Sequence, residues 1–345
     1  MKMRCLVSAI LLPAFAAVIG QASDSVKTIG GKTLIGEITQ ITPLKVVIDR
    51  GGVTEEIPSI EIQSVNFDGE PGAMKTVRNY VADGKMQEAV VVLDKVEFKT
   101  APRKEVQQDY DYYRAYLAAK LAVAGEGEIK DAGSKMLAWV NANPTNFHYY
   151  DACQILGDLL LGLRRYDQAC LYYNKLSDSP FPELKMRAGV ATGRTLLLEK
   201  KTAEAQKAFD AVLAVSATGD LADSQRLIAT LGKARCAIEM GRPDDVVKTI
   251  EEVIEKTDSE QNPEAMATAY NTLGAAYKKA GKTKEALMAY LHVDVMEAYA
   301  KCADAHAEAL ANLVDLWTEL RQPDRANKAR HTLSENYKNS PWAGE

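Results

Sequence analysis

The few residues of this chain that could do chemistry are spaced in ways that argue against a reaction centre. Cys302 and His306 are four residues apart, so on a helix they would share one face and could hold half of a metal site. No further ligand follows at a suitable spacing, so we expect no metal there. Asp244 and Asp245 form a carboxylate pair directly after Pro243. Proline and acidic residues are favoured where a helix begins, so we interpret this pair as part of a helix cap.

Sequence motifs of the common enzyme classes are also missing. The chain contains no nucleophile elbow, no phosphate-binding loop, no HExxH zinc motif and no dinucleotide-binding glycine motif. None of its four histidines is followed by a second histidine four residues later. We therefore predict that the protein is not an enzyme and that it uses no cofactor.

A further candidate is a group of aromatic residues. Four tyrosines gather within residues 110–116, and two more pairs stand at Tyr149-Tyr150 and Tyr172-Tyr173. Such a group can form a platform for a sugar or a peptide, but aromatic rings also fill the space between packed helices. We favour the packing role.

The first residues are typical of an export signal. Lys2 and Arg4 precede an apolar stretch at residues 6–19, and Gly20-Gln21-Ala22 places small residues at the two positions that a signal peptidase reads. We predict a signal peptide at residues 1–22 and a periplasmic or extracellular protein; a retained N-terminal membrane anchor is the alternative. No later stretch is apolar for long enough to span a bilayer. The formal net charge of −5 argues against a nucleic-acid partner.

Residues 23–69 have the pattern of a small β domain. Short runs that alternate apolar and polar residues are separated by the turn signals Gly30-Gly31 and Gly51-Gly52, which predicts about five strands. So few short strands cannot form two large sheets, but they could close into a barrel. The pattern resembles the SH3-like and Sm-like small barrels. Some barrels of this shape bind RNA, but the export signal and the scarcity of Lys and Arg argue against that here.

Beyond a break at residues 68–72 the apolar period becomes helical, and residue types recur at fixed offsets. One stretch shows the full pattern. It starts with a large residue, a Leu-Gly pair and an aromatic residue at Tyr270, Leu273, Gly274 and Tyr277. It continues with a turn Gly, a small Ala and a second aromatic residue at Gly281, Ala286 and Tyr290. Most of these offsets return at Cys153, Leu156, Gly157, Leu160, Ala169 and Tyr173. Small residues at the Gly and Ala positions let two helices approach closely, and stacked pairs bury a continuous core.

These spacings resemble the tetratricopeptide repeat (TPR) pattern. The predicted fold is therefore mostly α: residues 70–345 form a TPR-like α-solenoid of about seven helical hairpins, preceded by the small all-β barrel. Adjacent units begin about 36 to 43 residues apart, where the family period is 34, so we expect lengthened helices or connectors.

The mature chain would keep four cysteines: Cys153, Cys170, Cys236 and Cys302. Each lies in an apolar helical pattern and no CxxC pair occurs, so we favour buried free thiols. An exported protein could still oxidise them. Whether Cys153 and Cys170 form a disulfide stays an open question, because the two residues fall on the two helices of one unit.

In TPR proteins the first helix of each unit lines a concave surface where partner peptides usually lie. The resemblance places six residues of this chain on that surface: Arg194, Arg235, Asn271, Lys278, Asn312 and Asp315. Equivalent places in an earlier unit are occupied by Asp151, Gln154 and Asp158. Such side chains could hold an acidic or extended peptide through carboxylate and backbone contacts. The Lys and Asn set of the chaperone-binding carboxylate clamp is absent, because Gln154, Asp158, Val190 and Arg194 stand in its place.

Together these observations predict an exported, non-enzymatic scaffold or adaptor. Its partner would be a protein or peptide of the cell envelope, bound on the concave face of the array. Two alternatives stay open. One is an accessory subunit or regulator of a cell-envelope enzyme complex. The other, ranked lower, is an RNA-binding barrel protein.

Overall fold

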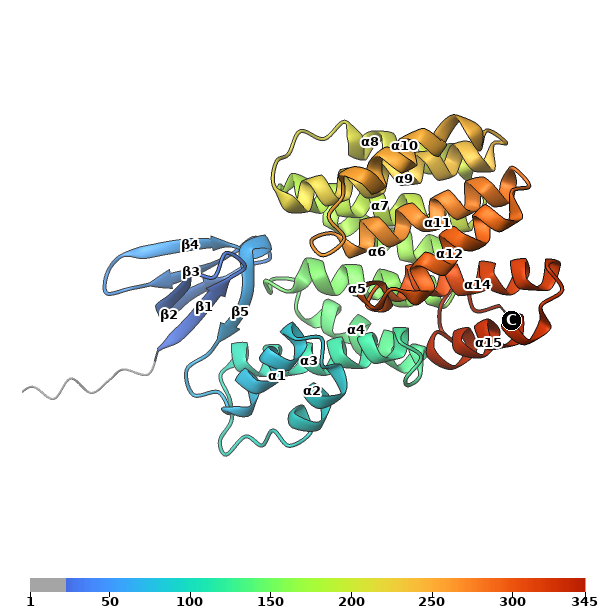
Figure 1. The fold of residues 1–345 in the computed structure, drawn as a ribbon. Helices are drawn as coiled ribbons and strands as arrows, with labels where there is room; N and C mark the ends of the chain where they lie inside the picture. The colour runs from blue at the N-terminus through green and yellow to red at the C-terminus, as the bar shows by residue number, and fades with distance from the viewer. Residues whose placement is uncertain (1–22, 345) are drawn as a thin grey trace, which may run out of the picture.

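The structure is a computed structural model that describes residues 23–344. The predicted signal peptide, residues 1–22, lies outside this part of the chain. A small antiparallel sheet comes first and a long array of helices follows (Figure 1). The predicted boundary between them at residues 69 and 70 falls between the last strand and the first helix.

Five strands form the sheet, as the sequence predicts. They are paired in the order β4-β3-β2-β1-β5, and every pairing is antiparallel. The strands are β1 (Asp24–Thr28), β2 (Thr33–Ile41), β3 (Lys45–Asp49), β4 (Thr54–Pro58) and β5 (Ile62–Asn66), and the 3₁₀ turn η1 (Ser59–Glu61) separates the last two. The described pairings do not join β4 to β5, so closure into an SH3-like or Sm-like barrel stays a prediction.

Alternation along the strands decides which face of the sheet is buried. Val26 of β1 lies opposite Leu34 of β2 on one side and Val65 of β5 on the other, and all three side chains are buried. Gly36 lies where a Cβ atom would collide with the carbonyl oxygen of Asp49. The register then shifts between Ile38 and Gln40, so the second strand is irregular at this point.

Fifteen helices occupy the rest of the described chain. Apart from the short α13 (Glu297–Ala300), they pack in sequence order as α-hairpins, in the number predicted. The hairpins are α1 (Ala73–Ala82) with α2 (Met86–Leu93), α3 (Lys104–Val123) with α4 (Ile129–Ala142), α5 (Tyr149–Gly162) with α6 (Tyr166–Ser177), α7 (Pro182–Leu198) with α8 (Thr202–Leu213), α9 (Asp220–Glu239) with α10 (Asp244–Lys256), α11 (Pro263–Lys279) with α12 (Thr283–Val295), and α14 (Ala303–Glu319) with α15 (Pro323–Asn336).

Close contacts between glycines and aromatic rings join the helices. A Cβ atom on Gly274 of α11 would lie 2.7 Å from the Tyr290 ring of α12, and one on Gly157 of α5 would overlap the Tyr173 ring of α6. Phe209 of α8 is completely buried, and its ring fills the space that side chains at Gly193 and Gly232 would need. The repeat spacing read from the sequence therefore marks real points of helix approach. Among the described residues, no helix combines the length and the apolar character needed to cross a bilayer.

A buried charge network holds the sheet to the first helices. The Arg78 guanidinium on α1 contacts Glu70 and Asp109 at 2.6 Å each, and it also donates to the Asn66 side chain of β5 at 3.1 Å. The other Asp109 oxygen lies 3.2 Å from the His148 ring. Burial acts to raise the pKa of Asp109, but the charge of Arg78 and the His148 hydrogen bond outweigh it and hold that pKa below its usual value.

The tyrosine group of residues 110–116 lies around the same network. Tyr112 and Tyr113 are buried, and the Tyr112 ring stacks on His148 with 3.7 Å between ring centroids. The Trp139 ring follows at 5.1 Å. These rings pack helix against helix, which is the role that we favoured for them.

The contact between Gly274 and the Tyr290 ring predicts that Gly→Ala substitutions at two helical positions change the free energy of unfolding in opposite directions. Gly274→Ala should lower the free energy of unfolding by about 1–3 kcal/mol, because the new methyl group must displace the Tyr290 ring. Gly133→Ala is the matched control, since Gly133 lies on α4 and no neighbouring atom lies within 4 Å of the place that its Cβ would take. That change should stabilise the protein by about 0.5–1 kcal/mol through helix propensity. Urea unfolding measures both, and equal effects would contradict the packing described.

The charge network predicts a pH-dependent contribution to stability. Because the pKa of Asp109 is lower in the folded state, the unfolded chain takes up this proton first as the pH falls. The contribution of Asp109 should therefore be complete above about pH 5 and be lost progressively below about pH 4. Asp109→Asn should cost about 1.5–3 kcal/mol at pH 7 and much less at pH 3. Asp94→Asn, at an exposed carboxylate, should show no such trend in urea unfolding.

Candidate functional site: the cavity inside the helical array

The inner surface of the array encloses a cavity of about 720 Å³. The first helices of successive hairpins, α7, α9, α11 and α14, pack against one another and supply most of its wall. The end of α3, α5 and residues 337–342 beyond α15 complete the lining. In Figure 1 the last hairpin lies beside the end of α3, so the array curls back on itself. The volume falls in the range of about 300–1,000 Å³ that is usual for ligand sites.

Two of the six residues predicted for the concave surface line this cavity. Arg194 of α7 pairs with Glu264 of α11 at 2.9 Å and also reaches the Thr268 hydroxyl at 3.4 Å. Arg235 of α9 pairs with Glu308 of α14 at 2.7 Å. Both arginines therefore meet a carboxylate on a helix two hairpins further along the chain.

The other four predicted residues lie outside the cavity lining, between α11 and α14. The buried Asn271 side chain donates to the Ala305 carbonyl at 2.7 Å. The Lys278 ammonium contacts Asp315 at 2.9 Å and Asn312 at 3.0 Å. These four residues connect two neighbouring first helices, and the structure does not bring all six predicted residues into one site.

Of the acidic residues that line the cavity, the resemblance placed only Asp158 on the concave surface. Asp158 accepts a hydrogen bond from the Tyr173 hydroxyl at 2.9 Å, and Asp304 accepts one from the Trp342 ring N–H at 3.2 Å. Burial raises the pKa of the Asp158 carboxyl. The Asp304 side chain is exposed to solvent. Asp304 lies in the first turn of α14, two residues after Cys302. No sequence motif identifies it as a candidate site residue.

The cysteine–histidine pair does not form a metal site. Cys302 lines the cavity, whereas the His306 ring bonds to Tyr337 at 2.7 Å and to Asp294 at 3.0 Å. Within residues 23–344, no group of three or more metal-binding side chains comes together. The four cysteines of this range are free thiols, Cys153 and Cys170 included.

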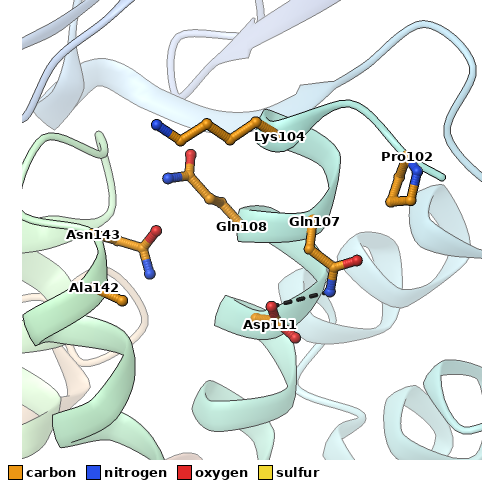
Figure 2. A pocket seen from close by; sticks show the side chains of 7 residues that line it. All are labelled: Pro102, Lys104, Gln107, Gln108, Asp111, Ala142 and Asn143. Carbon is orange, nitrogen blue, oxygen red and sulfur yellow. Dashed lines mark hydrogen bonds between the residues drawn. The ribbon is translucent and has the colours of Figure 1, made fainter.

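A second hollow of about 520 Å³ lies between the start of α3 and the end of α4 (Figure 2). Polar side chains surround it, but several of them are already bonded within the fold. The Gln107 amide donates to Asp111 at 3.0 Å, and the Asn143 amide donates to the Trp139 carbonyl of its own helix at 2.9 Å. We therefore take the cavity inside the array as the candidate site.

The ion pairs across the array predict two different coupling energies. A double-mutant cycle of Arg235→Ala and Glu308→Ala should give about 1.5–3 kcal/mol, because both partners are mostly buried and Arg235 donates to a charged oxygen. The matched cycle of Lys278→Ala and Asp315→Ala should give about 0.2–1 kcal/mol, since solvent screens that pair. Denaturant unfolding supplies all the values. A larger coupling energy for Lys278 and Asp315 than for Arg235 and Glu308 would contradict the buried position of the Arg235 pair.

Comparison with known proteins agrees with this architecture. Residues 150–178, which cover α5 and α6, match the family model described as "Tetratricopeptide repeat". A solved structure titled "Crystal Structure of Rap Protein Complexed with Competence and Sporulation Factor" aligns over 78% of this chain and 76% of its own, with a TM-score of 0.50. At 13% sequence identity that likeness concerns the fold alone. No curated protein matches the chain. The chain therefore carries a match to a tetratricopeptide repeat at α5 and α6, within a helical array that shares the fold of the Rap structure.

Proposed function

We propose that this protein is a non-enzymatic adaptor that holds a short segment of a partner protein in the cavity inside its helical array. The observation that carries the proposal is the position of this cavity on the inner surface, where the first helices of four hairpins meet. The family supports it, since stacked repeats characteristically create concave binding surfaces. The Rap structure is titled as a complex with a factor, and we extend that mode of action to this chain.

The chemistry of the cavity wall suits a peptide. Apolar side chains such as Leu197, Leu198 and Leu221 share the wall with acidic and basic residues in equal number. A balanced wall offers donors and acceptors for a backbone and for side chains of either charge. It does not offer the concentrated positive surface that a nucleic acid requires. This supports a protein partner over RNA.

The same wall supports a role without catalysis. Among the described residues, no histidine lines the cavity. The hydroxyl of Ser224 and the thiol of Cys302 therefore have no histidine in the lining that could act as their general base. Burial also raises the pKa of Cys302 to about 11, which keeps the thiol protonated and poorly nucleophilic at neutral pH.

We further propose that the adaptor acts outside the cytoplasm, in the cell envelope or beyond. The support is the charged start, the apolar stretch and the small residues up to Ala22. N-terminal sequencing of the mature protein from the envelope fraction should begin at Ser23. An intact N-terminus in the cytosol would overturn this part of the proposal.

Filling the cavity should abolish partner binding. Ala191→Trp places a large ring at the cavity wall, whereas Ala211→Trp adds the same ring at an exposed position of α8. In affinity capture with cross-linking from the envelope fraction, we expect the first variant to recover the partner at least about tenfold less, a change of about 1.4 kcal/mol. The second should match the unchanged protein. Equal recovery by both variants, or substrate turnover by the isolated chain, would contradict the proposal.

A further inference from the structure

The chain does not run out into solvent after α15 ends at Asn336. Residues 337–342, the C-terminal segment, pass beside the end of α3, and all of them except Lys338 line the cavity. The Asn339 side-chain amide donates to the Ala122 carbonyl at 2.7 Å, at the end of α3. The Trp342 ring N–H donates to Asp304 at 3.2 Å, at the start of α14. The C-terminal segment thus connects helices that are far apart in the sequence.

The surface that receives the C-terminal segment fits it closely. A Cβ atom on Gly162 would lie 2.7 Å from the Asn339 carbonyl oxygen, and one on Gly125 would lie 2.9 Å from the Asn336 carbonyl oxygen. A side chain at Gly162 would push the segment away, and one at Gly125 would push away the end of α15, from which the segment starts. These two glycines therefore leave room for the backbone at the end of α15 and in the segment.

The contacts of the C-terminal segment are specific but few. Tyr337 is buried and its hydroxyl bonds to His306, so the segment is anchored where it leaves α15. Beyond that anchor, Trp342 is only half-buried, where it packs with Ala343 at the edge of a hydrophobic cluster, and two side-chain hydrogen bonds complete the attachment. A typical hydrogen bond contributes about 0.5–1.5 kcal/mol net, so this end can detach while α15 stays packed through Ala326, Ala329 and Leu333.

We propose that the C-terminal segment occupies the mouth of the cavity as an internal ligand, and that the partner is a peptide that replaces it with the same chemistry. Such a peptide carries an aromatic ring N–H for Asp304 and a side-chain amide for the Ala122 carbonyl. The inference rests on the proposed function of the cavity. Because the segment is tethered, it competes at an effective concentration of about millimolar, so the partner binds only when it outcompetes the segment.

A synthetic peptide of residues 337–344, labelled with fluorescein, tests this competition on full-length protein. Fluorescence anisotropy should show at least about tenfold tighter binding to the double variant Asn339→Ala/Trp342→Ala than to the unchanged chain, because the altered segment no longer holds the site. Lys338→Ala, at an exposed residue of the same segment, is the matched control and should bind like the unchanged chain. Adding Asp304→Asn to the double variant should weaken binding again. Equal binding by all proteins, or no binding to the double variant, overturns the inference.

Hydrogen exchange of the unchanged protein provides a second test that needs no variant. The amides of Asn339, Ser340 and Trp342 should exchange at least about tenfold more slowly than in the free peptide, since the segment is held against α3 and α14. Exchange at the free-peptide rate overturns the internal-ligand inference alone. If the segment exchanges at the free-peptide rate while Ala191→Trp still blocks partner capture, the proposed function of the cavity stands without the internal-ligand inference.

Discussion

The contact between a glycine on one helix and an aromatic ring on the next sets the geometry of the whole array. Gly274 against Tyr290 and Gly157 against Tyr173 fix how closely the two helices of a hairpin approach. Phe209 extends the same constraint to the next hairpin, because its ring fills the space beside both Gly193 and Gly232. Since each hairpin is fixed to its neighbour, small rotations accumulate along the chain, and the array curls until its last hairpin meets the end of α3.

This curvature explains where the concave charges point. Arg194 and Arg235 each reach a carboxylate two hairpins further along, at Glu264 and Glu308. In a wide superhelix such side chains would face solvent or a bound peptide. Here the inner surface is narrow enough for them to meet one another, so a partly enclosed cavity with paired charges in its wall remains. The C-terminal segment then becomes part of that wall.

Much of the fold could be predicted from the sequence because its signals are local. Turn glycines, alternating strand residues and recurring Gly and Ala positions gave the five strands and the hairpins. The candidate site was predicted only in part: Arg194 and Arg235 line the cavity, but Asn271, Lys278, Asn312 and Asp315 connect α11 to α14. The bond from Asn339 to Ala122 joins residues 217 positions apart. It depends on the summed rotation of every hairpin between them, which no local pattern records, and Asp304 is part of the site only because the array closes.

The central claim is that the last hairpin of the array meets the end of α3, so that the array closes around a cavity. Photo-cross-linking tests it most directly, with benzoylphenylalanine in place of the exposed Lys338 in the full-length protein and the adducts located by mass spectrometry. The closed array predicts adducts within one molecule to residues 121–126 at the end of α3 or to residues 161–164 after α5. Adducts confined to α15 and its immediate neighbours, or formed only between molecules, would show an open array and contradict the claim.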